Sequence, residues 1–326
     1  MNDFTDGNLA PIGGFFELES FVNESPYHNN GIALTTGRAC IALILELTRP
    51  TRIYIPFYVC NSVIDPIKKS GIEYTFYEIN EALEPKKIPN LTNNELFLYI
   101  NYFGLKGEYC NKIAATYGEK IIIDDTHNFF NKGRKEVYSF TSARKYFGIP
   151  DGAFLYGADN KCIEEMPRNN NVSILHNIER LEGRYDAAYN LYKESESLID
   201  STIMRISYIS EFILNSIDYE YVKRKRIENY KYLQEKLDSS NTFTLPILSK
   251  IDVPFCYPFI PEKCINKKEL HQIGLFIPTF WLDICKRDMD GYELEKHLSL
   301  QMLPLPIDHR YGREEMKRIV EIIKNW

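Results

Sequence analysis

The sequence lacks closely paired cysteines, long apolar runs and any concentration of positive charge. Its seven cysteines are widely spaced, with no C-x-x-C pair, which argues against a disulfide framework and against a zinc site. The longest apolar runs, such as IALIL at 41–45, are too short to cross a membrane, and no secretory signal is evident at the start of the chain. We therefore expect a cytoplasmic protein without membrane association.

The charge pattern argues against a nucleic-acid partner. The formal net charge is −6, and the lysines and arginines are scattered among acidic residues, so no basic stripe is present. The densest basic run, VKRKR at 222–226, is typical of the solvated face of a helix. With 44% hydrophobic and 26% charged residues, the composition is that of an ordinary folded protein.

Short β-rich apolar runs alternate with helical patterns between residues 31 and 156, which predicts a mostly parallel sheet covered by helices. The predicted strands are 52–55, 73–79, 96–101, 120–125, 136–140 and 152–156, and the predicted helices are near 38–49, 60–70 and 108–117. Two or three long helices are predicted within 173–238. After them, apolar segments at 254–260, 274–281 and 302–307 alternate with helices near 266–273, 291–300 and 312–326. We predict a large α/β domain at 1–235, with bridging helices from about 173, and a small α+β domain at 236–326.

One predicted strand ends in acidic residues. Three isoleucines at 121–123 precede Asp124 and Asp125, and His127 follows. A carboxylate at the carboxyl end of a parallel strand lies at the ligand-binding edge of the sheet, where it can keep a heteroaromatic nitrogen protonated. The plainer alternative is that Asp124 caps the following turn.

Two other stretches are candidates for ligand binding. In TTGRACIALIL at 35–45, a polar turn opens an apolar helix, so backbone N–H groups and Arg38 could bind a phosphate, although such turns are only weakly specific. In SFTSARKYFGIPDG at 139–152, Arg144 and Lys145 precede an Asp-Gly turn. A lysine beside another cation, in a partly buried place, can become a nucleophilic amine, whereas a solvated loop pair is the alternative.

The order of these elements resembles that of the DegT/StrS-type sugar aminotransferases, which have the fold type I architecture of aspartate aminotransferase. The resemblance extends to RIYIPFYVCNSVIDPIKKSGIEYTFYEIN at 52–80 and to LPLPIDHRYGREEMKRIVEIIKNW at 303–326. It implies a seven-stranded, mostly parallel sheet, a pyridoxal 5'-phosphate cofactor and a homodimer. It also implies transfer of an amino group, usually from glutamate, to a nucleotide-linked keto-sugar.

The resemblance also implies roles for particular residues. Asp124 would pair with the pyridine nitrogen, His127 would lie near the phenolic oxygen, and Ser139 would bind the phosphate. The predicted cofactor contacts are completed by Thr36, Gly37, Arg38, Ala39, Tyr58 and Cys60. At three positions the chain departs from the family. Counted without gaps from Ser139, Arg144 takes the place of the family's lysine, Arg38 stands where a threonine is usual, and Cys60 stands where an aromatic residue stacks on the pyridine ring. The family's mid-chain Asn-x-Arg segment has no clear counterpart.

Two hypotheses follow. In the first, a one-residue distortion after Phe140 lets Lys145 reach the aldehyde, so that Lys145 is both the Schiff-base residue and the general base of a sugar aminotransferase in surface polysaccharide biosynthesis. In the second, Arg38 and Arg144 bind a phosphorylated or nucleotide-sugar ligand in a non-catalytic or lysine-independent protein, because a guanidinium cannot form an imine.

Overall fold

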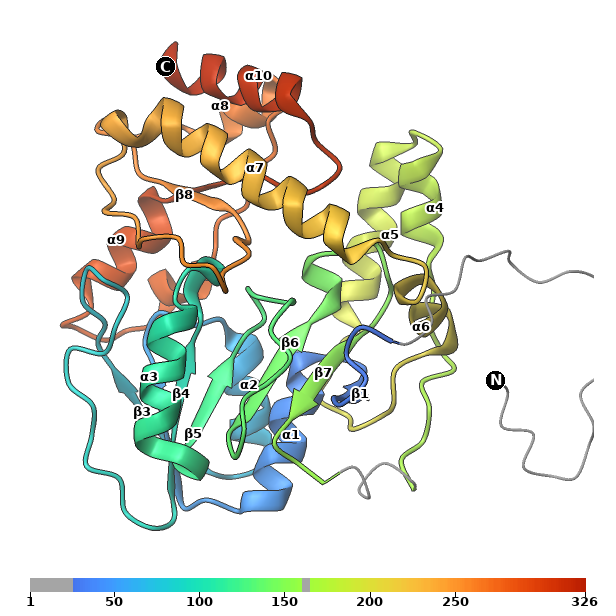
Figure 1. Ribbon diagram of the computed structural model, residues 1–326, viewed down its shortest axis with the longest axis vertical. Coiled ribbons are helices and arrows are strands. Elements are labelled where there is room, and N and C mark those ends of the chain that lie inside the picture. The colour runs from blue at the N-terminus through green and yellow to red at the C-terminus, as the bar shows by residue number, and fades with distance from the viewer. Residues whose placement is uncertain (1–25, 160–164) are drawn as a thin grey trace, which may run out of the picture.

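A mixed seven-stranded sheet forms the centre of the molecule in the computed structural model, which describes residues 26–159 and 165–326 (Figure 1). The first 25 residues, where no targeting segment is predicted, lie outside the described residues. The strand order is β1-β7-β6-β5-β4-β2-β3. Strands β2 to β6 run parallel, whereas β7 pairs antiparallel with β6 and with β1. The strands are β1 Ile32–Leu34, β2 Arg52–Pro56, β3 Glu73–Tyr77, β4 Glu95–Ile100, β5 Ile121–Asp124, β6 Tyr138–Ser142 and β7 Ala153–Tyr156.

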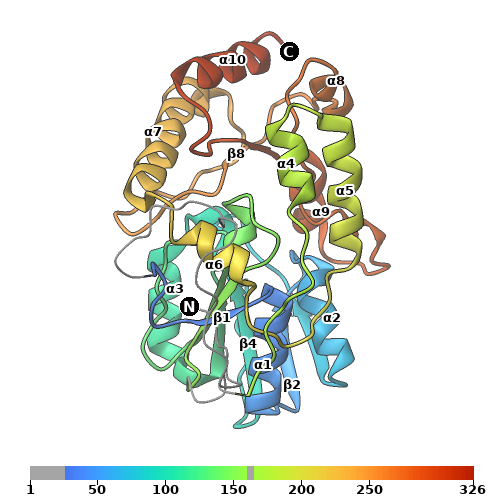
Figure 2. The same cartoon turned by 90° about the vertical axis from the view of Figure 1, so that its right-hand side faces the viewer.

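Helices cover both faces of this sheet, as expected for a parallel sheet whose strands are apolar on both sides. Figure 2 shows α3 (Gly107–Tyr117) on one face, with α1 (Gly37–Thr48) and α2 (Asn61–Lys69) on the other. Every residue of β4 and β5 is buried. The predicted α/β class is therefore confirmed, and each of the six predicted strands has a counterpart. Strand β1 was not predicted, because a three-residue IAL run carries too little pattern to stand out.

Two or three long helices were predicted within 173–238, and two of the helices found there are long, with 13 and 19 residues. The structure has four helices there: α4 Leu175–Leu181, α5 Tyr185–Ser197, α6 Tyr208–Leu214 and α7 Tyr219–Leu237. Gly183, with φ +77°, separates α4 from α5, because a left-handed backbone ends a helix. Helices α4 and α5 form a hairpin that projects from the sheet (Figure 1), and Ala188 is the one residue of the pair that is buried.

The C-terminal segment packs around a two-stranded antiparallel sheet of β8 and β9. Its elements are β8 Tyr257–Phe259, α8 Lys267–Gln272, the 3₁₀ helix η6 Leu282–Lys286, α9 Glu293–Gln301, β9 Leu303–Leu305 and α10 Arg313–Lys324. Helix α10 buries Met316, Ile319, Val320 and Ile323, an i, i+3, i+4, i+7 stripe that packs against α7. The segment at 274–281 forms no strand. The domain boundary at 235/236 stays a prediction.

Within the described part of the chain, no helix combines the length and the apolar character needed to cross a bilayer.

Candidate functional site

A cavity of about 260 Å³ lies where three neighbouring parallel strands end. Ile100, Asp124 and Ser142 close β4, β5 and β6 respectively, and all three line it. This is the edge at which open α/β sheets bind ligands. The lining includes most of the residues predicted from the sequence, namely Thr36, Gly37, Arg38, Cys60, Asp124, Arg144 and Lys145.

The N-terminus of α1 forms one wall of the cavity. The Thr36 hydroxyl caps the helix by accepting a hydrogen bond from the Ala39 N–H at 3.0 Å. Because that cap uses the Ala39 N–H, the predicted backbone contact to a ligand is left to Gly37 and Arg38. Arg38 places a cation in the first helical turn, which contains no acidic residue. A cation is unfavourable there because the N-terminus of a helix already carries a partial positive charge. An anion bound at this wall would offset that partial charge and the charge of Arg38.

Asp124 is 4% exposed; it caps the following turn and also lies at the cavity wall. Its Oδ1 accepts the Thr126 N–H at 2.9 Å, which is the turn cap, and the residue also lines the cavity. Burial raises the pKa of its carboxyl group, and the positive charge of Lys145 and the Thr126 hydrogen bonds lower it in part. A cationic partner would stabilise the ionised form of this buried carboxyl group.

Arg144 and Lys145 lie in η3 (Ala143–Lys145), the 3₁₀ turn that follows β6. Lys145 is an exposed residue, but its Nζ donates to the Thr126 Oγ1 at 3.1 Å. Arg144 instead forms an ion pair with Glu196 of α5, which also lines the cavity. The amine therefore lies beside Asp124, while a carboxylate from the hairpin holds the guanidinium.

Ser139 does not line the cavity. Side chains alternate along β6, and Phe140 and Ser142 are the strand residues that line it, so Ser139 belongs to the opposite face. Its Oγ is buried and has no hydrogen-bond partner in the described residues. The expected phosphate contact of Ser139 is thus not seen in the geometry, and Ser142 is the strand hydroxyl that faces the cavity.

His127 and Tyr58 are also outside the cavity, in an aromatic cluster behind it. The His127 ring stacks on Phe255, with ring centroids 4.4 Å apart, and lies nearly parallel to Trp281 at 5.6 Å. Its Nδ1 accepts the Phe103 N–H at 3.3 Å. Burial, and then the charge of Lys145, hold the pKa of His127 well below its usual value. Tyr58 is fully buried and packs edge-on against Trp281 at 4.3 Å.

No protein-family model and no curated protein sequence matches the chain. A DegT DnrJ EryC1 StrS aminotransferase from Brucella abortus is similar in structure, with a TM-score of 0.60 and 14% identity over 90% of this chain and 85% of that one. The sugar aminotransferase CalS13 from Micromonospora echinospora has a TM-score of 0.65 and 11% identity over 94% and 93%. NtdA from Bacillus subtilis, solved with bound cofactor PMP, has a TM-score of 0.61 and 15% identity over 93% and 78%.

The chain has the fold of these aminotransferases. This confirms the fold type I architecture that the sequence resemblance implied, although identities of this size show the fold alone.

Several cavity residues were missed by the sequence analysis. Thr126 and Ser142 follow predicted strand positions, and no sequence pattern distinguishes their small hydroxyl side chains as site residues. Tyr192 and Glu196 line the cavity from one face of α5, and their i, i+4 spacing could have marked that face. Trp281 lines the cavity from the C-terminal segment, far along the chain from the other lining residues.

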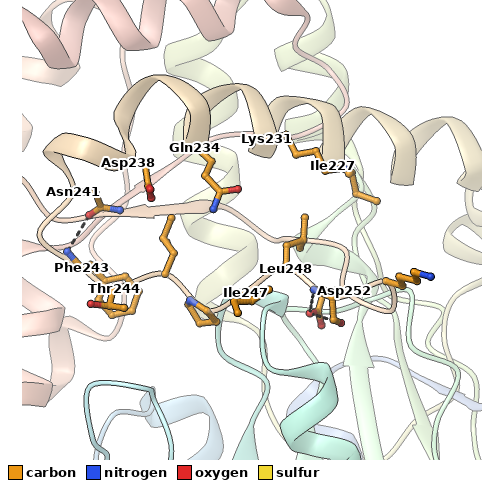
Figure 3. Close-up of a pocket in the computed structure, with 14 residues that line it drawn as sticks. Ile227, Lys231, Gln234, Asp238, Asn241, Phe243, Thr244, Ile247, Leu248 and Asp252 are labelled. Atoms are coloured by element: carbon orange, nitrogen blue, oxygen red, sulfur yellow. Dashed lines mark hydrogen bonds between the residues drawn. The ribbon is translucent and has the colours of Figure 1, made fainter.

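A second, larger cavity of about 700 Å³ lies between α7 and the segment 243–252 (Figure 3). It contains none of the predicted site residues. Its Asp252 already accepts hydrogen bonds from the Gly107 N–H and from Ser249. Despite its size it lacks convergent reactive groups, so the smaller cavity is the candidate site. The described residues hold no cluster of three or more His, Cys, Asp or Glu side chains suited to a metal ion.

Proposed function

We propose that the protein is a pyridoxal phosphate-dependent aminotransferase that acts on a keto-sugar. The observation that carries the proposal is the placement of the Lys145 amine next to Asp124 at the cavity wall. The structural neighbours include the sugar aminotransferase CalS13, and another neighbour, NtdA, was solved with bound PMP. That likeness supports the reaction class.

The cavity residues fit this cofactor by their chemistry. The N-terminus of α1 and Arg38 would hold the phosphate, because oriented N–H groups and a guanidinium both favour anions. Asp124, a buried carboxylate at the cavity wall, would hold the protonated ring nitrogen. The Lys145 amine would hold the cofactor covalently by condensing with its aldehyde group, with loss of water. When bound, the cofactor supplies an electron sink that permits amino-group transfer.

Side chains of the protein would then carry out the proton transfers of the reaction. The Lys145 amine, once free, would take the proton from the α-carbon of the amino donor as a general base, and in the second half of the reaction it would deliver a proton to the former keto carbon of the sugar as a general acid. Thr126 would orient the amine between these steps. Arg144 cannot take this part because it stays protonated, and its pairing with Glu196 keeps it at the cavity wall.

The finer details of the function are also proposals. The sugar would be nucleotide-linked, as the sequence resemblance implies. Glutamate would be the amino donor, and the product would enter surface polysaccharide synthesis in the cytoplasm. The protein would act as a homodimer. In support, the α4–α5 hairpin exposes large apolar side chains, including Leu181, Tyr185, Tyr189 and Leu198, and such patches mark interfaces.

The test is covalent capture of the cofactor. Purified protein is mixed with pyridoxal phosphate, reduced with borohydride and digested, and the modified peptide is identified by mass spectrometry. We expect one pyridoxyl group on Lys145, lost in Lys145→Ala and kept in Arg144→Ala. The Arg144→Ala variant is the matched control, because it removes the neighbouring cation from the same turn.

Two results would overturn the proposal. One is the absence of a pyridoxyl group on Lys145 in the unaltered protein. The other is equal labelling of Lys145 and of solvated lysines such as Lys135, which is 90% exposed, because random labelling follows exposure. In either case, tight binding of a nucleotide-sugar that is lost in Arg38→Ala would support a non-catalytic ligand-binding protein instead.

A further inference from the structure

Trp281 has a strained backbone at the wall of the cavity. Its φ and ψ are 53° and 44°, a left-handed conformation that is an outlier for a bulky residue. The other described non-glycine residues with positive φ are Arg49, Leu83, Phe103 and Glu136. None of those four lines the cavity, whereas Trp281 does. Strain of this kind persists where the surroundings impose it, and it clusters at functional sites.

Hydrogen bonds to its carbonyl group hold Trp281 in this conformation. The Trp281 oxygen accepts the Ile284 N–H at 2.9 Å and the Ser299 hydroxyl at 3.2 Å. Ser299 is 1% exposed, and its hydroxyl also lies 2.9 Å from the Phe280 oxygen. The indole is therefore presented by a backbone that neighbouring elements fix in place.

Arg287 ties the Trp281 segment to the loop that carries Cys60. Its guanidinium donates to the Phe57 oxygen at 2.6 Å and to the Val59 oxygen at 2.7 Å. Val59 and Cys60 both line the cavity, as does Trp281. Trp281 is the one cavity-lining residue that follows Glu196 in the chain. These Arg287 hydrogen bonds thus bring the indole of Trp281, from a distant part of the chain, to the cavity wall that also contains Cys60. The Cys60 side chain is only a small thiol.

The ring contacts show how the indole of Trp281 packs beside the cavity. The indole and His127 rings are inclined by 15°, with centroids 5.6 Å apart, and Tyr58 approaches at 82°. His127 is 2% exposed and does not line the cavity. Trp281 therefore lines the cavity, whereas the His127 ring, to which its indole is nearly parallel, does not.

We infer that Trp281 is the stacking wall of this site, which binds the face of a planar aromatic ring. The ring would be the pyridine of pyridoxal phosphate, so the inference rests on the proposed function. Aromatic pairs in offset or edge arrangements stabilise binding beyond the area they bury. Loss of the ring should weaken cofactor binding by about 2- to 10-fold, while another aromatic side chain should preserve binding.

The test uses fluorine NMR on protein labelled with 5-fluorotryptophan. The chain has two tryptophans, Trp281 and Trp326, so two resonances are expected, and Trp326→Phe assigns them. Trp326 is 44% exposed at the chain end and serves as an internal control. Pyridoxal phosphate should shift the Trp281 resonance and leave that of Trp326 unchanged. Saturating inorganic phosphate, which has no ring, should shift neither.

Binding measurements complete the test. We expect Trp281→Phe to keep the dissociation constant of pyridoxal phosphate within about 2-fold, and Trp281→Ala to raise it by about 2- to 10-fold. A pyridoxyl group on Lys145 without a selective Trp281 shift would overturn the stacking role and leave the proposed function intact. A selective shift without the pyridoxyl group would support stacking and overturn the proposed function. Absence of both would overturn both.

Discussion

The Nζ atom of Lys145 lies 3.1 Å from the Oγ1 atom of Thr126. The backbone N–H of the same threonine donates to Asp124 at 2.9 Å. One residue therefore holds the amine and the carboxylate at a fixed spacing on the cavity wall. This arrangement links the turn after β6 to the end of β5. The strands β5 and β6 are themselves paired in the sheet.

Asp124→Asn should stabilise the protein without cofactor at neutral pH. The folded state raises the pKa of this carboxyl group, so it binds the proton more tightly than the unfolded chain does. The free energy of unfolding of the unaltered protein therefore falls as pH rises from the ordinary aspartate pKa through the raised one. The asparagine has no such dependence and should keep the Thr126 hydrogen bond.

Urea denaturation of both proteins from about pH 4 to about pH 8 measures this difference. The stability gain of the variant should grow with pH across the titration. A gain that does not vary with pH would contradict the predicted burial effect. Cofactor capture should be weaker in the variant, since the neutral amide cannot hold a protonated ring nitrogen as an ion pair.

Asp125→Ala should cost about 3–5 kcal/mol of stability, because it leaves a buried guanidinium without its partner. Arg134 pairs with Asp125 at 2.5 Å, and their side chains are 9% and 3% exposed. The matched control is Glu78→Ala, which breaks a solvent-exposed pair with Lys86 and should cost less than about 1 kcal/mol. Chemical denaturation measures both, and equal losses would contradict the distinction.

Gly104→Ala should be far more damaging than Gly71→Ala. The two glycines have nearly the same φ, +70° and +69°, so the backbone penalty of about 1–2 kcal/mol is shared. A methyl group at Gly104 would overlap the His127 carbonyl oxygen and lie 2.8 Å from that of Val253, whereas at Gly71 it would meet nothing within 4 Å. The difference in unfolding free energy should be about 1–3 kcal/mol. A similar loss in both variants would show that the loop at Gly104 can move.

Thr36→Ala should lower stability by about 1 kcal/mol, because it removes the cap of α1. Asp218→Ala is the control, since Asp218 caps α7 through the Tyr221 N–H at 2.9 Å and does not line the cavity. Both variants should lose similar stability in thermal unfolding. Only Thr36→Ala should also weaken pyridoxal phosphate binding, measured by equilibrium dialysis. Equal binding in both would place the phosphate elsewhere.

The sequence predicted the elements that local chemistry determines. The isoleucines before Asp124 form β5, and the polar turn before the apolar run at 39–45 becomes the capped start of α1. Such patterns depend on side-chain periodicity and on turn residues within a few positions, which a single sequence contains.

Features that depend on register or on distant contacts were not predictable in this way. Strand β6 begins two residues later than the predicted 136–140 segment, at Tyr138, and alternation along it brings Ser142 to the cavity and leaves Ser139 on the other face. Trp281 reaches the site because Arg287 binds carbonyl groups of the loop before α2. No local pattern encodes a contact between segments so far apart in the chain.

The pairing of β1 has a consequence for synthesis on the ribosome. Ile32 to Leu34 pair with Leu155 to Ala153 of β7, and β1 leads through Thr36 directly into α1. The start of α1 can therefore reach its final position only after β7 has emerged, since non-local pairing must wait for its partner. A nascent chain arrested before residue 153 should leave this end of the protein accessible to protease, and release of a longer chain should protect it.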